Sequence, residues 1–233
     1  MFRFNWKLTA FTLLLLPLLL SLGYWQLQRE QLKIQMQSRY EQRLVQAPLT
    51  LDYVDWQDTD LGWMRITATG YFEPRQQFLL DNRIFQSRVG YEVLTPFRTD
   101  YGTLLVNRGW IAQGVTRQVL PALPVPDERI TISAVVYVPD GELMVLGADD
   151  FSGDNWPKVV QRLDMASLAD TLGFSLLPYS VRLEENSPGL LQYNWQPVNT
   201  RPETHRGYAV QWFIMALVLL VLYFMFSFRR TEH

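Results

Sequence analysis

The 233-residue chain contains no cysteine. This absence excludes thiolate metal sites, CxxC redox chemistry and a cysteine nucleophile. Histidine is nearly absent as well, because His205 and His233 are the only two in the chain. A zinc or copper site built from several histidines is therefore not expected.

The chain also lacks an excess of charge of one sign. Its formal net charge is −2 and no basic stripe runs along it, so nucleic acid is not an expected partner. The GxSxG, HExxH and P-loop motifs of common hydrolases, metalloproteases and nucleotide-binding enzymes are all missing. We therefore expect that the protein is not an enzyme.

What the chain does contain is two long apolar segments without a charged residue. They are residues 8–25 (LTAFTLLLLPLLLSLGYW) and 208–228 (YAVQWFIMALVLLVLYFMFSF). A helix of about 20 apolar residues crosses the hydrocarbon core of a bilayer, so both segments are predicted to be transmembrane helices. Two crossings place residues 1–7 and 229–233 on one side and a single domain, residues 26–207, on the other.

A cleavable signal peptide is the alternative interpretation of the first apolar segment. Arg3 and Lys7 precede the segment, and the small residues Ser21 and Gly23 could mark a cleavage site. The polar helical pattern that follows Trp25 instead indicates a helix that continues out of the bilayer.

The basic residues do not assign the orientation of the two spans. Lysine and arginine are usually enriched on the cytoplasmic flanks. Here the flanks on the domain side carry at least as many basic residues as the two terminal flanks. No transit-type presequence precedes the first span, which favours a bacterial chain.

The segment between the spans has the pattern of an α+β domain rich in antiparallel strands. Residues 26–44 predict a helix that ends before Pro48. Asp164 is a predicted N-cap and Gly173 a predicted stop for a short helix. Alternating or β-branched runs predict the strands, at residues 64–70, 78–82, 89–97, 103–110, 130–138, 159–163 and 179–183.

His205 is the candidate site residue, because it lies just before the second span. Offsets of three, four and seven on a helix place Tyr208, Ala209 and Trp212 on its face. Imidazole is a common axial ligand of haem iron, and Arg201 or Arg206 could pair with haem propionates. The alternative is a polar interfacial histidine that only caps the start of the helix.

Four sequence blocks resemble those of the Surf1/Shy1 family of cytochrome c oxidase assembly factors. Residues 22–29 (LGYWQLQR) resemble the LGxWQLxR signature, and residues 90–96 (GYEVLTP) are similar to the GYxVLTP strand. Residues 106–110 (VNRGW) match the VNRGW motif, and residues 205–213 (HRGYAVQWF) resemble the HxxYAxQWF start of the second span. The blocks occur in the family order, within the same frame of two spans.

The resemblance implies a membrane-bound factor that assists the building of haem–copper oxidases. It implies transient binding of haem A with His205 as the ligand of the iron, and candidate contacts from Trp212 and Arg206. The implied partners are the membrane, the catalytic subunit of cytochrome c oxidase, haem A synthase and a second copy of the chain. The implied location is the inner membrane of a bacterium, with the domain in the periplasm.

Two features depart from the family picture or leave it incomplete. Arg206 and Gly207 stand where an apolar residue is common, and the predicted domain side offers no second histidine for a bound haem. Two other functions remain open at this stage. One is a structural chaperone of the oxidase subunit that binds no cofactor, and the other is a membrane-tethered sensor or enzyme.

Overall fold

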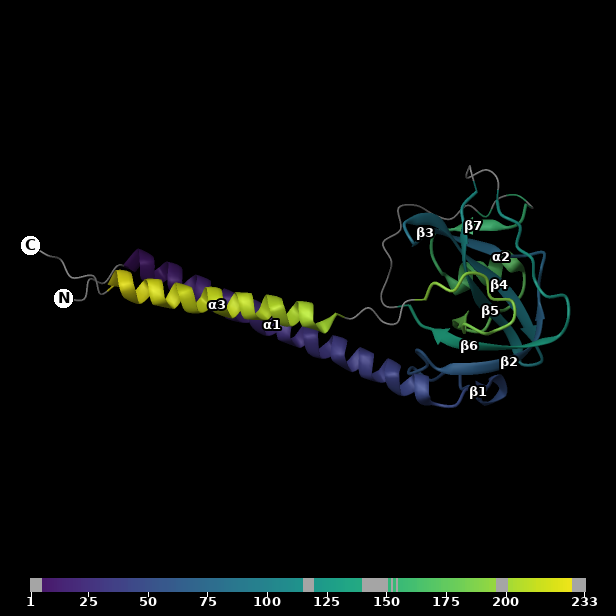
Figure 1. The fold of residues 1–233 in the computed structure, drawn as a ribbon, viewed down its shortest axis with the longest axis horizontal. Helices are drawn as coiled ribbons and strands as arrows, with labels where there is room; N and C mark the ends of the chain where they lie inside the picture. Colours follow the sequence, from purple (N-terminus) through teal and green to yellow (C-terminus); the bar gives the residue numbers. More distant parts are fainter. Residues whose placement is uncertain are drawn as a thin grey trace, which may run out of the picture. The chain divides into compact units, whose positions relative to one another are not determined.

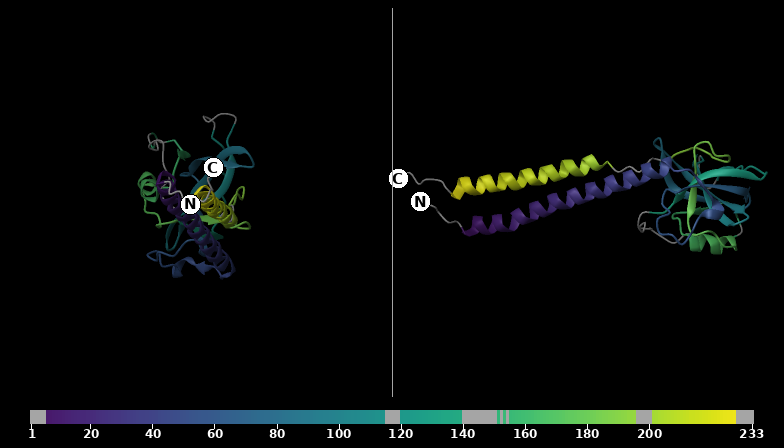
Figure 2. Two further views of the ribbon diagram at one scale, coloured as in Figure 1. Left: turned by 90° about the vertical axis from the view of Figure 1, so that its left-hand side faces the viewer. Right: turned by 90° about the horizontal axis from the view of Figure 1, so that it is seen from below.

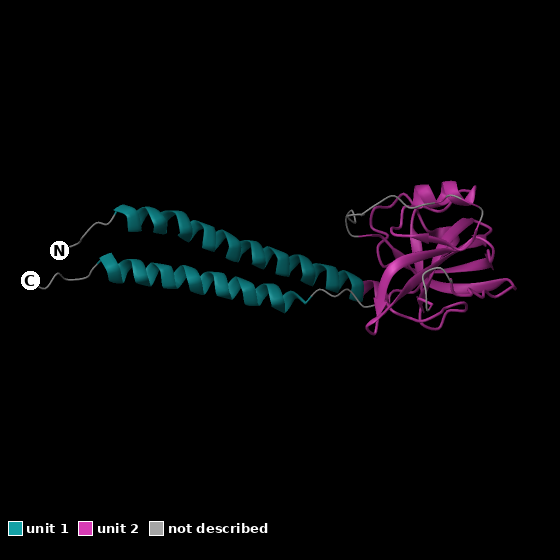
Figure 3. Ribbon diagram, turned by 90° about the horizontal axis from the view of Figure 1, so that it is seen from above, with its two compact units in different colours: residues 1–41, 197–233 teal, residues 42–196 magenta. Residues whose placement is uncertain are grey.

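The structure is a computed structural model that describes residues 6–114, 120–139, 151, 153, 155–195 and 201–227. The chain forms two compact units (Figure 3). One unit joins the two ends of the chain, residues 1–41 and 197–233, and the other is formed by residues 42–196.

The first unit contains a pair of long helices, α3 (Pro202–Ser227) and all but the last residues of α1 (Trp6–Val45). Both are long and apolar enough to cross a membrane. They lie side by side and antiparallel (Figures 1 and 2), and the hydroxyls of Thr9 and Tyr223 are 3.1 Å apart. The prediction of two membrane helices around a strand-rich domain is confirmed.

Helix α1 continues without interruption through the end of the first apolar segment. It contains Pro17 and ends at Val45, ahead of Pro48. Proline disfavours helical backbone at the residue before it, which explains why the helix stops here. Helix α1 extends beyond both ends of the predicted segment 8–25, whereas α3 begins before the predicted segment 208–228 and ends at Ser227. The levels at which the helices leave the bilayer stay a prediction.

The second unit contains a closed β-barrel (Figure 1). Its strands are β1 (Leu49–Thr50), β2 (Arg65–Phe72), β3 (Phe78–Phe85), β4 (Arg88–Thr99), β5 (Gly102–Ala112), β6 (Ile130–Tyr137), β7 (Lys158–Val160) and β8 (Ser180–Leu183). The sheet order is β1-β2-β6-β8-β5-β4-β3-β7, and an additional pairing between β2 and β4 closes β2-β6-β8-β5-β4 into a ring. A short 3₁₀ helix, η1 (Leu51–Tyr53), follows β1.

Most strand pairs are antiparallel, as the sequence predicts. The hairpins β3–β4 and β4–β5 form a meander. The pairs β1–β2, β3–β7 and β5–β8 are parallel, which the sequence pattern does not indicate. Strands β7 and β8 lie far along the chain from their parallel partners, β3 and β5. No turn residues in the sequence therefore indicate these two pairings.

The interior of the barrel is apolar. The residues that fill it include Ile66, Phe97, Val106, Ile132 and Val181, each fully buried. Burial of such side chains stabilises the fold by roughly 1.5–3 kcal/mol each.

Helix α2 (Met165–Leu172) covers a second apolar cluster, formed by outward-facing residues of β3, β4 and β5. Asp164 accepts a hydrogen bond from the Ser167 backbone N–H, and Gly173 ends the helix at φ 76°. Both ends of this helix are where the sequence predicts them. The backbone hydrogen bond from Ser167 holds the pKa of Asp164 below its usual value.

Candidate functional site

His205 lies in the first turn of α3, on the face that packs against α1. The same face carries Ala209 and Ala216, which are 1% and 3% exposed, because residues four and seven apart share a helix face. His205 itself is half-buried. Its Nδ1 lies 2.8 Å from Oε1 of Gln26 on α1.

The contact with Gln26 favours one tautomer of the neutral imidazole. An amide oxygen accepts a hydrogen bond, so Nδ1 of His205 carries the proton in this arrangement. In the neutral ring Nε2 then holds the free lone pair, and no described residue forms a hydrogen bond with it. An unprotonated Nε2, supported by a second residue at Nδ1, is the usual form of a metal-binding histidine.

Arg206, like His205, contacts a side chain of α1. Its guanidinium forms an ion pair with Glu30 of α1, with 2.6 Å between Nη2 and Oε1. The Glu30 side chain is only 8% exposed, whereas that of Arg206 is 66% exposed. The predicted haem-propionate partner is therefore already engaged by a buried carboxylate that sequence reasoning missed.

The predicted constellation around His205 is only partly brought together. Ala209 and the half-buried Trp212 lie on the same side of α3 as His205. Tyr208 is 49% exposed and lies off that face. Farther along the pair the helices are in close contact, since a Cβ on Gly23 would lie 2.7 Å from Cε1 of Phe213.

The residues around His205 fit a haem in one respect and restrict it in another. The available Nε2 of His205 fits an axial ligand of the iron. The close packing of Gly23 and Phe213 leaves no space for a flat macrocycle between the helices at that level. A haem held by His205 would thus have to avoid this contact, and a contact between Trp212 and the haem stays a prediction.

The motif at residues 106–110 lies in β5 and holds neighbouring segments of the domain together. Arg108 is fully buried and donates hydrogen bonds to the carbonyl oxygens of Gly189 and Pro124 and to Gln77. Burial lowers the pKa of Arg108 to about 10. Its neighbour Gly109 adopts φ 104°, where a Cβ would lie 2.5 Å from the carbonyl oxygen of Gln192.

The sequence predicts a strand over residues 103–110 whose last residues form a turn that shapes the fold. In the structure these residues form an irregular segment within β5. The register of β5 against β4 shifts between Glu92 and Leu94, next to Asn107 and Arg108. Arginine and glycine here tie β5 to the segments around residues 124 and 189–192. The contacts of Arg108 and Gly109 give the motif a role in folding, because they join separate segments of the domain.

Other candidate ligands are scattered over the described part of the chain. Within it, no three His, Cys, Asp or Glu residues come together to hold a metal ion. Asp60, in the acidic stretch after Pro48, pairs with Arg43 at 3.1 Å. That stretch, residues 52–60, is largely exposed.

Sequence reasoning isolated His205 but missed its partners on α1. Gln26 lies inside the LGYWQLQR block and Glu30 directly after it. An antiparallel pairing of the two spans brings this block opposite the block that begins at His205. That juxtaposition is the signal that would have found both residues.

Comparison with known proteins gives matches over almost the whole chain. A family model described as "SURF1 family" matches residues 13–217. An uncharacterized SURF1-like protein of Mycobacterium bovis is 32% identical over 179 residues, which cover 76% of this chain and 65% of the relative. The chain thus spans about two thirds of the length of that mycobacterial relative.

Other relatives match over nearly their full length. A SURF1-like protein of Rickettsia felis is 26% identical over 93% of this chain and 95% of its own. One of Caenorhabditis briggsae is 24% identical over 95% of this chain and 76% of its own. By the extent of the family match, this chain belongs to the SURF1 family.

Proposed function

We propose that the protein is a membrane-bound assembly factor for haem–copper oxidases that binds haem A through His205 and assists its delivery to the catalytic subunit. Family membership supports the role in oxidase assembly. The observation that carries the haem proposal is the pairing of His205 Nδ1 with Gln26, because it leaves Nε2 as the free ligand nitrogen.

Bound haem would supply an iron that binds an imidazole nitrogen, and the chain's own residues would orient that nitrogen. Gln26 fixes the ring plane and the tautomer of His205. Glu30 holds Arg206 on the side of α3 next to that ring. A propionate could recruit Arg206 only in competition with Glu30.

The proposed location is the inner membrane of a bacterium, with the strand-rich unit in the periplasm. The two apolar helices support membrane association. The antiparallel pair supports a topology in which both helices end on one side, since Thr9 and Tyr223 meet there. The catalytic oxidase subunit, haem A synthase and a second copy of the chain are the proposed partners.

The test is an absorption spectrum of the full chain purified from cells that synthesise haem A. We expect a haem spectrum for the wild type and its loss in His205→Ala, with both proteins present in the membrane in equal amounts. His233→Ala is the matched control, because it removes the other histidine of the chain. Wild-type protein that carries no haem when purified from such cells would contradict the proposal that the protein binds haem A.

Oxidase activity in the same strains separates haem delivery from a chaperone without cofactor. We expect His205→Ala to lower the amount of active oxidase in a deletion strain that carries only this variant. Full oxidase activity with His205→Ala would instead support the structural chaperone. Normal oxidase activity in the deletion strain itself would contradict a role in assembly.

A further inference from the structure

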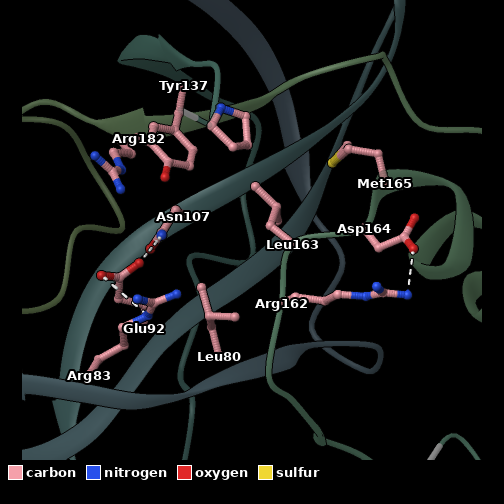
Figure 4. Close-up of a pocket in the computed structure, with 11 residues that line it drawn as sticks. Leu80, Arg83, Glu92, Asn107, Tyr137, Arg162, Leu163, Asp164, Met165 and Arg182 are labelled. Carbon is pink, nitrogen blue, oxygen red and sulfur yellow. Dashed lines mark hydrogen bonds and ion pairs between the residues drawn. The ribbon is translucent and has the colours of Figure 1, made fainter. Parts of the chain in front are cut away.

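The domain contains a hollow of about 490 Å³ on the outer surface of the barrel, beside the start of α2 (Figure 4). Its size is within the range of small-molecule sites, about 300–1,000 Å³. A second hollow of about 530 Å³ shares Arg83, Glu92 and Arg182 with the first. The two hollows thus meet at a charged wall.

That wall is a row of polar side chains across five neighbouring strands, β6-β8-β5-β4-β3. Side chains alternate between the two faces of a strand, so the neighbours Val136, Val181 and Val106 point into the barrel while the polar residues point outward. Figure 4 shows the polar residues gathered on one side of the hollow. They are Tyr137, Arg182, Asn107, Glu92 and Arg83.

Glu92 is the one carboxylate of this polar row, and its oxygens are already engaged. Its Oε2 accepts a hydrogen bond of 2.7 Å from Asn107, and its Oε1 one of 3.5 Å from Asn194. Nε of Arg83 lies 3.9 Å from Oε1, too far for a hydrogen bond. Two guanidinium groups face one carboxylate, so the row carries an excess of one positive charge.

The guanidinium of Arg182 lies over two aromatic rings. Its Cζ lies 3.6 Å from the ring centroid of Tyr137 and 4.8 Å from that of Trp195. Burial lowers the pKa of Arg182, which shows that the folded environment disfavours its charge. The Tyr137 side chain also forms a hydrogen bond with Arg182, which leaves Nε as the donor without an acceptor among the described residues.

The two arginines have hydrogen-bonding capacity that the fold does not use. The Nε atoms of Arg83 and Arg182 are both buried, and neither has an acceptor among the described residues. Buried donors without an acceptor are rare in folded proteins and call for an explanation. Packing against the aromatic rings explains the orientation of Arg182. It does not explain why two arginines that line the same hollow both have an Nε atom without an acceptor.

We propose that this hollow binds a small organic carboxylate, whose negative group pairs with Arg83 and Arg182. Arginine recognises carboxylates through strong, charge-assisted hydrogen bonds. Tyr137, Leu163 and Met165 supply apolar surface for the body of such a ligand. The proposal depends only on the strand-rich unit and does not require that the protein bind haem.

Calorimetric titration of the full chain in detergent tests the proposal with three probes. They are 3-phenylpropionate, its neutral amide 3-phenylpropanamide, and inorganic phosphate. We expect saturable binding of 3-phenylpropionate that weakens with added salt, and no binding of the amide. Phosphate binding as tight as that of 3-phenylpropionate would overturn the assignment to an organic carboxylate.

Variants of the wall identify the site. Arg83→Gln and Arg182→Gln should each weaken the binding of 3-phenylpropionate about tenfold, the loss expected for one charge-assisted hydrogen bond. Arg129→Gln is the matched control, because Arg129 pairs with Asp100 outside the hollow. Equal binding in Arg83→Gln, Arg182→Gln and wild type would overturn the proposal.

Glu92→Gln separates the proposed site from a general loss of folding. Removing the competing negative charge should strengthen the binding of 3-phenylpropionate severalfold, which a damaged fold would not do. Circular dichroism identifies any variant that fails to fold, and Arg83→Gln remains informative because the Arg83 side chain is one-third exposed. Unchanged or weaker binding in a folded Glu92→Gln protein would count against the site.

Discussion

His205 and Gln26 are 179 residues apart in the chain, yet Nδ1 of one lies 2.8 Å from Oε1 of the other. This contact joins the two blocks that flank the membrane segments, LGYWQLQR and HRGYAVQWF. Under the proposed function, Gln26 is a positioning residue. Its amide oxygen favours the neutral tautomer of His205 that carries its proton on Nδ1.

Replacing Gln26 by leucine should weaken haem binding about tenfold or more, the usual cost of losing the partner of a ligand histidine. The leucine keeps the bulk of the side chain and removes the acceptor. Titration of the purified protein with haem, followed by the Soret band, measures the change. Gln28→Leu is the matched control because Gln28 is exposed on the same helix.

A measurement without haem checks the same contact. In protein labelled with ¹⁵N at the imidazole nitrogens, His205 should show the tautomer protonated at Nδ1, and Gln26→Leu should shift the ring toward a tautomer mixture. His233→Ala assigns the signals, since the chain has two histidines. An identical tautomer in wild type and Gln26→Leu would contradict the role of Gln26.

The pair of Glu30 and Arg206 predicts a coupled effect on stability. Arg206→Ala should destabilise the helix pair by on the order of 1–3 kcal/mol, because it leaves the buried carboxylate of Glu30 without its partner. The double variant Glu30→Gln, Arg206→Ala should recover most of this loss. Thermal unfolding in detergent of the wild type, both single variants and the double variant measures the coupling. Additive effects of the two substitutions would show that the ion pair contributes nothing.

Structural features that depend on neighbouring residues in the chain, such as the ends of a helix, could be predicted from the sequence. Asp164 and Gly173 enclose helix α2 as expected, because capping depends on the residue itself and its nearest neighbours. His205 could be singled out because the chain has only two histidines and this one lies directly before the second span. Its face was predicted only in part, since Ala209 and Trp212 share it and Tyr208 does not.

Features that depend on pairing between distant segments could not be predicted. The register Gly70↔Thr99 to Phe72↔Phe97, which closes the barrel, leaves no trace in the local pattern of β2 or β4. The polar row around Glu92 and Arg182 likewise arises only when five strands are aligned. Its residues look like ordinary exposed positions of separate strands.

Gly109 is expected to tolerate no side chain. Its φ of 104° strains any other residue, and a Cβ would lie 2.5 Å from the backbone oxygen of Gln192, which cannot move aside as a flexible side chain would. Gly109→Ala should therefore cost at least about 1–3 kcal/mol of the free energy of unfolding. Urea unfolding followed by tryptophan fluorescence measures the loss.

Gly62→Ala is the control for this substitution. A Cβ on Gly62 would meet nothing within 4 Å, and its φ is not in the left-handed region. We expect a change within about 0.5 kcal/mol, as for other surface substitutions. Equal stability of both alanine variants would show that the bulge in β5 adapts to a side chain.

Asp164 should make the stability of the domain depend on acid. Its pKa is lower in the folded protein than in the unfolded chain, chiefly because the backbone N–H of Ser167 donates to the carboxylate. The unfolded state therefore binds a proton more readily. The stabilisation is fully present above the unfolded pKa of about 3.9, and it is lost as the pH falls through the lower folded value.

Asp164→Ala tests this dependence through the N-cap of α2. At pH 7 the variant should lose about 1 kcal/mol of the free energy of unfolding. At pH 3 the difference from wild type should shrink, because this pH lies below the unfolded pKa of about 3.9 and the carboxylate of the unfolded chain is then mostly protonated. Asp164→Asn, which keeps an acceptor without the charge, should lose less at pH 7. Asp170→Ala on the exposed side of the same helix is the control and should change little at either pH. A loss in Asp164→Ala that is equal at pH 7 and pH 3 would show that the charge of the cap contributes nothing, and that the hydrogen bond alone accounts for its effect.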